Sequence, residues 1–124
     1  MKYLLDSNVV ILALAGASEA LMHRFLGCDE GELALSTISY GEVALGSVNG
    51  KPPSFYLLQA FLEVVELVPF DQAAARAYAT LPFKRASFDR LIAAHALALG
   101  LTLVTANVAH FADVPGLKVE NWTV

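Results

Sequence analysis

Short apolar runs alternate along this chain with stretches whose apolar positions recur at a helical period. Runs such as Leu101-Thr102-Leu103-Val104 lack the strict alternation of a half-exposed strand, so they suit strands buried on both faces. Strands that alternate with helices build βαβ units and a mainly parallel sheet with helices on both faces. The sequence therefore predicts a three-layered α/β fold. The expected strands are Tyr3–Leu5, Leu33–Ser36, Leu67–Phe70, Leu101–Thr105 and, last, Leu117–Val119.

Residues that favour helix ends mark the segments between these strands. Ser18 and Asp71 are suited to cap the start of a helix. Pro52 and Pro53 favour the first turn of a helix, and Gly100 favours a helix end. The expected helices are Val9–Leu14, Glu19–Leu26, Ile38–Leu45, Pro52–Val65, Gln72–Thr80 and Ser87–Gly100.

Length and composition indicate one compact domain. A chain of 124 residues can bury a core of its own, and we expect a single domain over residues 1–124. Hydrophobic residues make up 56% and charged residues 16%, which excludes disorder and leaves apolar surface for an oligomer. Cys28 is alone, so no intrachain disulfide can form and a reducing compartment fits. We therefore expect a cytoplasmic protein, and Asp6, ahead of the first apolar helix, argues against a secretory signal.

Three carboxylates stand where strands end or helices begin. Asp6 follows the first strand directly, Glu42 lies in an otherwise apolar helix, and Asp89 lies in the first turn of another. In open parallel sheets, ligands bind beyond the carboxyl ends of the strands. Carboxylates that meet in that crevice would form a site for a hard divalent cation. Such a site predicts a metal-dependent enzyme that cleaves phosphodiester bonds.

Each of these acids, taken alone, also has a simpler explanation. Asp6 could cap the following helix, although the Ser and Asn after it could do so equally well. Glu42 could face solvent, but the adjacent Gly41 costs a helix about 1 kcal/mol relative to Ala, which suggests a close approach there. Asp89 could simply favour the helix dipole, by roughly 0.3–1 kcal/mol. Only their common placement favours a site.

Two other polar positions lie near the expected crevice. Asn107 follows the strand Leu101–Thr105 and would reach the same place, although Asn is also common in turns. His95 and His110 are weaker candidates, and His95, within an alanine-rich helix, is expected to be packed.

The net charge of −4 is unfavourable for a nucleic-acid binder, because phosphates are neutralised by Lys and Arg. Lys84, Arg85 and Arg90 surround Asp89 in sequence and are the best candidates for contacts with RNA. An ordinary solvated surface explains these three cations equally well.

Four short motifs and the end of the chain resemble a known family. Their order is that of PIN-domain proteins, and the closest likeness is to the VapC-type toxins of bacterial and archaeal toxin–antitoxin pairs. The likeness spans essentially the whole chain. The motifs are Tyr3-Leu4-Leu5-Asp6-Ser7-Asn8, Ser39-Tyr40-Gly41-Glu42-Val43, Phe88-Asp89-Arg90-Leu91-Ile92-Ala93-Ala94-His95-Ala96 and Leu103-Val104-Thr105-Ala106-Asn107, followed by Val114-Pro115-Gly116-Leu117-Lys118-Val119-Glu120-Asn121-Trp122.

The resemblance implies a Mg²⁺- or Mn²⁺-dependent ribonuclease, an endonuclease that is usually a homodimer and is inhibited by a cognate antitoxin. Asp6, Glu42 and Asp89 would be the metal-site acids, and Ser7 would support the site by hydrogen bonding. The fourth acidic position falls on Asn107, which departs from the fully acidic motif. We therefore expect one well-occupied metal position, with Asp6 and Asp89 as direct ligands and Glu42 holding water.

Two other functions remain open. The first is a PIN module with a weakened site that binds RNA or a protein partner, an alternative that Asn107 and the acidic charge favour. The second is a phosphotransferase with Asp6 as nucleophile, but that chemistry expects an Asp where Asn8 stands. The apolar stretch from Phe55 to Leu62 suggests a dimer or antitoxin surface, and a plain core helix is the alternative.

Overall fold

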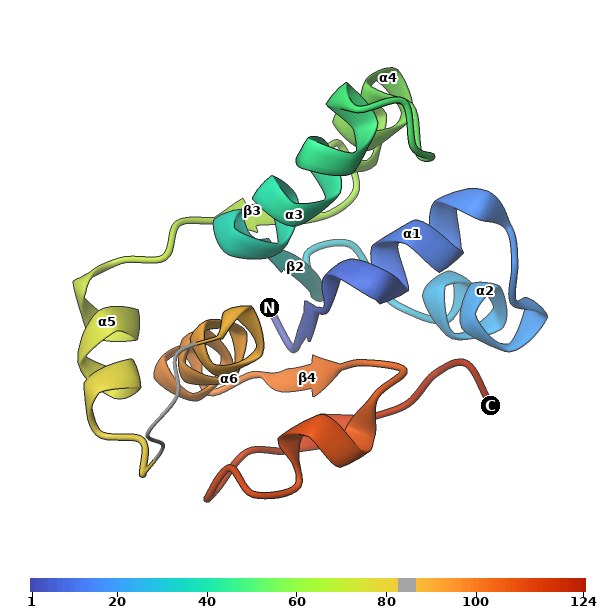
Figure 1. Cartoon of the computed structure of the whole chain (residues 1–124). Coiled ribbons are helices and arrows are strands. Elements are labelled where there is room, and N and C mark those ends of the chain that lie inside the picture. Colours follow the sequence, from blue (N-terminus) through green and yellow to red (C-terminus); the bar gives the residue numbers. More distant parts are fainter. Residues whose placement is uncertain (83–86) are drawn as a thin grey trace.

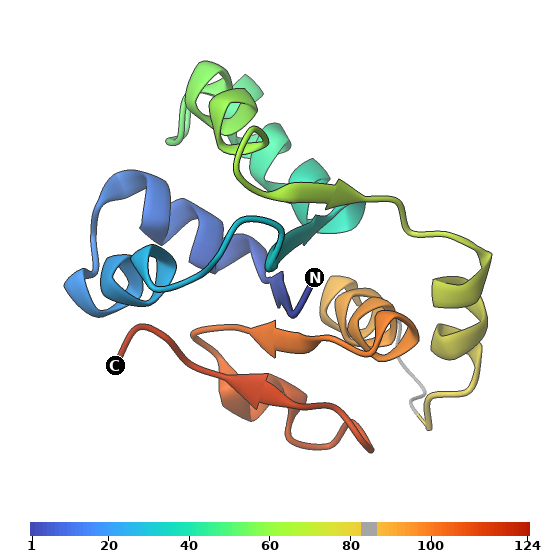
Figure 2. The ribbon, with the colours of Figure 1, turned by 180° about the vertical axis from the view of Figure 1, so that it is seen from behind.

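The computed structural model describes residues 1–82 and 87–124. Within these residues the strands form one parallel sheet in the order β3-β2-β1-β4-β5 (Figures 1 and 2). The first strand therefore lies at the centre, flanked by the second and the fourth. The strands are β1 (Tyr3–Leu5), β2 (Leu33–Ser36), β3 (Glu66–Val68), β4 (Thr102–Val104) and β5 (Val119–Glu120).

Helices connect these strands and cover both faces of the sheet (Figure 1). The helices are α1 (Ser7–Ala15), α2 (Glu19–Leu26), α3 (Thr37–Val48), α4 (Phe55–Phe61), α5 (Gln72–Ala79) and α6 (Phe88–Leu99), with a 3₁₀ turn η1 (Val108–Phe111). The three-layered α/β architecture predicted from the sequence is confirmed.

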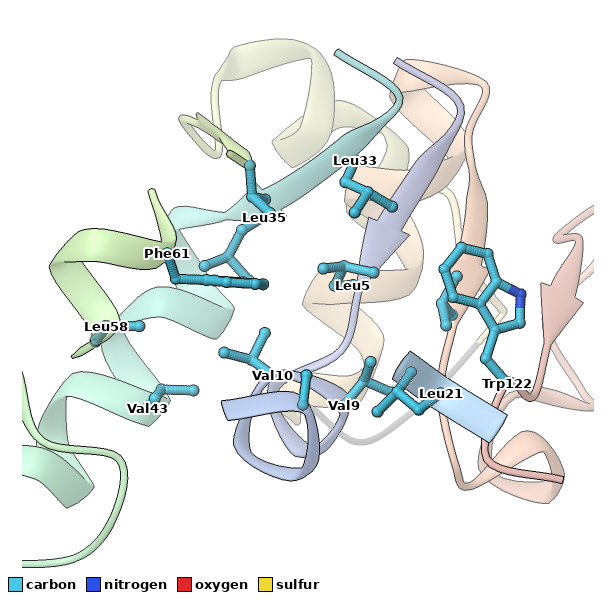
Figure 3. Close-up of a cluster of buried hydrophobic side chains, with 13 residues drawn as sticks. Leu5, Val9, Val10, Leu21, Leu33, Leu35, Val43, Leu58, Phe61 and Trp122 are labelled. Carbon is cyan, nitrogen blue, oxygen red and sulfur yellow. The ribbon is translucent and has the colours of Figure 1, made fainter. Parts of the chain in front are cut away.

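The core divides into two clusters, one on each face of the sheet. Alternate residues of a strand point to opposite faces, so Leu5 and Leu4 of β1 enter different clusters. Leu5 packs with side chains of α1, α2, α3 and α4, including Val9, Leu21 and Phe61 (Figure 3). The second cluster joins Leu4 to α6 and η1. Burial on both faces explains why the sequences of the three central strands, β2, β1 and β4, do not alternate.

Several element boundaries differ from the sequence prediction. The helix expected from Pro52 begins instead at Phe55, because the Ser54 hydroxyl accepts from the Leu57 N–H and caps the helix there. That helix ends at Phe61 rather than Val65. The third strand covers Glu66–Val68 rather than Leu67–Phe70. The last strand is Val119–Glu120 rather than Leu117–Val119.

The predicted caps are confirmed. Ser18 accepts a hydrogen bond from the Leu21 N–H, and Asp71 accepts one from the Ala74 N–H. Gly100 ends α6 with φ = 69°, a left-handed conformation that glycine adopts without strain.

No single helix in the described part of the chain is long and apolar enough to cross a membrane. Only α1 and α2 taken together reach that length and hydropathy, and they are bent by 99° relative to each other.

Candidate functional site

The register between β1 and β4 brings Asp6 beside Thr105. Leu5 is paired with Val104 in the parallel ladder, and the Asp6 N–H donates to the Val104 carbonyl oxygen at 2.9 Å. One residue further, the Thr105 hydroxyl donates to Asp6 Oδ2 at 2.9 Å. Two side chains 99 positions apart in sequence therefore meet at the carboxyl edge of the sheet.

Asp6 also caps α1, which begins at Ser7 rather than at the expected Val9. Its Oδ1 atom accepts from the Ser7 N–H at 2.8 Å, so capping and a functional role are not exclusive explanations for this acid. Both Asp6 and Ser7 are buried, with Asp6 5% exposed. Because each Asp6 oxygen receives one hydrogen bond, the carboxylate is held in a fixed orientation.

Burial raises the pKa of the Asp6 carboxyl above its usual value, because a charged group loses solvation inside the protein. The hydrogen bonds from Thr105 and Ser7 oppose this rise by stabilising the ionised form. The nearby Asp89 adds to the rise, and His110 opposes it. The net effect is a raised pKa, so the ionised form of Asp6 is less favourable in the folded protein than in water.

Glu42 approaches the same edge from α3. It is half-buried in the helix that directly follows β2, whose start is capped by Ser36. Burial raises its pKa, and the charges of Asp6 and Asp89 raise it further. Asp6, Glu42 and Asp89 are thus close enough for their charges to influence one another.

Asp89 lies in the first turn of α6, a helix capped by the Ser87 hydroxyl, which accepts from the Arg90 N–H at 3.2 Å. Because α6 leads into β4 of a parallel sheet, its first turn lies at the carboxyl edge, near Asp6. His110 Nδ1, in η1, lies 3.5 Å from Asp89 Oδ2 and forms an ion pair with it when protonated.

Asn107 precedes η1 and is half-buried. Its backbone N–H donates to Thr105 Oγ1 at 3.0 Å, so Thr105 links Asn107 to Asp6. This short chain of hydrogen bonds fixes the backbone around the fourth position of the sequence motif.

The three carboxylates therefore share one edge of the sheet and are electrostatically coupled, but they do not form a closed cage. Within residues 1–82 and 87–124, no three acidic, histidine or cysteine side chains are grouped closely enough to hold a metal ion by themselves. A cation held here would draw the remaining ligands from water or substrate, as Mg²⁺ commonly does.

The cations expected to contact RNA are differently placed. Arg90 donates to both carboxylate oxygens of Asp113, at 2.8 and 3.0 Å, so its charge is already engaged. Lys84 and Arg85 lie outside the described residues.

His95 is packed, as predicted. It is 1% exposed, its Nδ1 lies 2.8 Å from Ser36 Oγ, and its ring meets Phe70 edge-on. No part of the described chain makes the close approach expected at Gly41, because an added Cβ would meet none of its atoms within 4 Å.

Two further polar side chains lie at this edge, beside Asp6 and Asp89. The sequence places Thr105 only in a strand and makes His110 a weak candidate. The signal for Thr105 was its position just after a strand predicted to end at the crevice, in the same motif as Asn107. His110 follows Asn107 by three residues, which is one turn of a 3₁₀ helix.

Comparison with known proteins decides the family. The family model described as "PIN domain" matches residues 3–117. The chain belongs to the PIN domain family. This confirms the resemblance seen in the sequence motifs, and the parallel sheet is the fold expected of it.

Curated relatives of this PIN domain match it over nearly their full lengths. A "tRNA(fMet)-specific endonuclease VapC" of Shigella flexneri is 26% identical over 132 residues, which cover 99% of each chain. A "Ribonuclease VapC2" of Rickettsia felis is 29% identical over 132 residues, 98% of each chain. A crystal structure of VapBC2 from Rickettsia felis bound to a promoter DNA fragment contains a chain with a TM-score of 0.85 and 27% identity. That likeness covers 98% of this chain and 99% of that one.

Proposed function

We propose that this PIN domain, over residues 1–124, is a divalent-metal-dependent ribonuclease and the toxin of a toxin–antitoxin pair, acting in the cytoplasm. The observation that carries the proposal is that Asp6, Glu42 and Asp89 gather at the carboxyl edge of the sheet, close enough for the charge of Asp89 to raise the pKa of the other two carboxyls. Full-length relatives named as VapC ribonucleases support it.

The residues present fit Mg²⁺ or Mn²⁺. Both ions prefer oxygen ligands, and the site offers carboxylates whose mutual repulsion a cation would relieve. Asp6 and Asp89 would supply direct ligands, and Glu42 would hold water at the site. When bound, the ion lowers the pKa of water and offsets negative charge on a phosphate.

The chain's own residues perform the remaining tasks. Thr105 and Ser7 hold the Asp6 carboxylate in one orientation through their hydrogen bonds to its two oxygens. Oriented ligands of this kind raise metal affinity, and losing such a supporting contact typically costs about 10- to 100-fold. Glu42, whose pKa is raised, is suited to accept a proton from water that attacks an RNA phosphodiester.

Asn107 bears on how many ions bind. It contributes no charge at the fourth position, so a second ion would lack a carboxylate that the fully acidic motif provides. We expect one tight site, with a second filled only when RNA supplies phosphate ligands. Calorimetric titration with Mn²⁺ tests this, and two equally tight sites without RNA would contradict it.

The decisive experiment is ribonuclease activity of the purified protein with Mg²⁺ or Mn²⁺, with a chelator control. Asp6→Asn should abolish cleavage, because it removes the central ligand charge. Asp71→Asn is the matched control, since Asp71 caps α5 and Asn is an equally good cap. Equal activity in wild type and Asp6→Asn, or no cleavage with any metal, would leave the alternative of a non-catalytic RNA- or protein-binding PIN module.

Partners are proposed from the relatives and the surface. Related structures are VapBC complexes, so we propose a cognate antitoxin partner here. The stretch from Phe55 to Leu62 is partly buried and partly exposed. Leu58 and Phe61 are core residues, whereas Tyr56 is 81% exposed. An exposed apolar face of this kind supports a homodimer. Light scattering of the purified chain, with and without its antitoxin, measures both assemblies.

A further inference from the structure

A cavity of about 390 Å³ adjoins the acidic edge. Its walls come from α3 and the start of α6, and Glu42 forms part of them. Glu42 lines this cavity, and its carboxyl is close enough to Asp6 and Asp89 for their charges to raise its pKa, so the cavity lies next to the acid group. The lining residues are Thr37, Ile38, Gly41, Glu42, Leu45 and Phe88.

Phe88 is the unusual residue of this cavity. It is 58% exposed although it is a large apolar aromatic side chain, and it immediately precedes Asp89. Leu45, on the α3 side, is 66% exposed. Most aromatic side chains of this size bury far more of their surface in a folded protein. Phe88 shares this cavity with Glu42, so an exposed aromatic ring and a proposed site acid line the same space.

Gly41 explains how the space is kept open. It lies in α3 between the cavity walls, and a Cβ added there would meet nothing within 4 Å. A glycine inside a helix weakens that helix relative to alanine. The helix therefore contains an unfavourable residue at a position that lines the cavity, where the missing side chain leaves room.

We propose that this cavity is a nucleobase subsite and that Phe88 stacks on a base of the RNA adjacent to the cleaved phosphate. The inference rests on the proposed ribonuclease function, because a phosphate held at the acids places its neighbouring base within reach of Glu42. An apolar wall with an aromatic face suits a nucleobase better than a phosphate or a sugar, since bases stack on aromatic rings.

The chemistry of the walls also predicts the specificity. Stacking tolerates every base, and preferences then follow stacking strength rather than hydrogen-bond recognition. Purines present the larger stacking surface. The subsite should therefore favour a purine next to the cleaved bond, and oligoadenylate should bind more tightly than oligouridylate.

A fluorescent substitution tests the contact directly. Trp122 is the one tryptophan of the chain and is 1% exposed, so Phe88→Trp adds a single solvent-exposed reporter. The experiment uses the full chain with Asp6→Asn to prevent cleavage, titrated with oligoadenylate. We expect quenching of the added tryptophan. Tyr56→Trp in the same background is the matched control, because Tyr56 is 81% exposed on α4, outside the cavity.

Two further variants test the energetic role. Phe88→Ala should weaken RNA binding by roughly 5- to 150-fold, the range for loss of one stacked base, whereas Phe88→Tyr should retain it. Gly41→Leu should weaken binding by filling the cavity without loss of thermal stability, since its Cβ would meet no neighbour and leucine favours a helix more than glycine does.

The outcomes separate this inference from the ribonuclease proposal. Quenching without cleavage by the wild type would support the base subsite and overturn the nuclease. Metal-dependent cleavage with unchanged RNA affinity in Phe88→Ala and Gly41→Leu would overturn the subsite alone. Quenching of the added tryptophan by the antitoxin but not by RNA would assign Phe88 to the protein interface and likewise overturn it.

Discussion

Replacing Thr105 by Val is the sharpest test of how the site is held together. The substitution keeps the volume and the β-branched shape of a side chain that is fully buried. It removes the hydroxyl that donates to Asp6 Oδ2 and accepts from the Asn107 N–H. Any change in stability therefore reports on those two hydrogen bonds rather than on packing.

The expected loss is a few kcal/mol. A hydrogen bond to a charged group contributes about 1.5–3 kcal/mol, and the half-buried Asn107 N–H left without its acceptor adds about 1 kcal/mol. The total of roughly 2–4 kcal/mol is a large part of a typical stability of 5–15 kcal/mol. With about 2.1 cal/mol/K of unfolding entropy per residue over 124 residues, Tm should fall by roughly 8–15 °C.

The loss should also depend on pH. The folded-state pKa of Asp6 is raised, so ionising Asp6 costs stability as pH rises through that pKa. The Thr105 bond reduces this cost because it stabilises the ionised form. Thr105→Val therefore raises the Asp6 pKa further, and the deficit should grow from low pH to a plateau above the Asp6 pKa.

Urea denaturation of the wild type and of Thr105→Val at pH 4 to 8 without metal measures the difference in their free energies of unfolding. Thr102→Val, in the half-buried first position of β4, is the matched control and should change stability by less than about 0.5 kcal/mol. A Thr105→Val deficit below about 0.5 kcal/mol at pH 7, or one that is the same at every pH, would refute the reasoning.

Three further outcomes follow from the same structure. Glu42→Gln should raise the metal-free Tm at pH 7, because the folded-state pKa of Glu42 is raised and its ionisation costs stability; the gain should vanish below pH 4, and activity should fall by about 10- to 100-fold. A Glu42→Gln protein less stable than wild type at pH 7 would contradict this. Ser87→Ala should cost about 1 kcal/mol in urea denaturation by removing the cap of α6, and an unchanged midpoint would argue against that cap. Gly100→Ala should cost about 1 kcal/mol or more, because φ = 69° is strained for alanine; a neutral result would mean that the turn rearranges.

The layered fold could be predicted because local signals agree with it. Continuous apolar runs marked the buried strands, and Ser18, Asp71 and Gly100 marked helix ends through local backbone chemistry. The α4 boundary failed because two signals competed. Proline favours a first turn, but Ser54 offers a side-chain acceptor to the Leu57 N–H, and that hydrogen bond sets the helix start.

The site could be predicted only in part. Asp6 was placed correctly because it follows a central strand, a relation that lies within one short segment. Its partner Thr105 depends on the register between β1 and β4, which no local pattern encodes. The same limit applies to Arg90, which pairs with Asp113, 23 positions further along the chain. That ion pair engages a cation that was expected to contact RNA. Gly41 was recognised as unusual, but whether the space beside it is filled or open is a tertiary property.

An acidic chain with few cations near its proposed site would need part of its affinity for RNA from contacts other than phosphate neutralisation. Arg90 is engaged by Asp113, so the candidates for phosphate contacts are Lys51, which lines a groove shared with Glu42, and, by their place in the sequence, Lys84 and Arg85, which lie outside the described residues. With about three such contacts, the slope of log Kobs against log salt should be near −2 for single strands. Stacking of a base on an aromatic ring neutralises no phosphate, so it adds nothing to this salt dependence.

The two kinds of contact can be distinguished by measuring the affinity of the Asp6→Asn protein for oligoadenylate at several salt concentrations and a fixed Mg²⁺ concentration. A slope near −2, together with loss of affinity in Phe88→Ala at an unchanged slope, would separate the base contact from the phosphate contacts. A slope steeper than about −4 would require six or more neutralised phosphates, more than the cations named above provide. RNA binding would then depend on cations from a partner subunit. The inference that about three cations of this chain contact phosphates would be wrong.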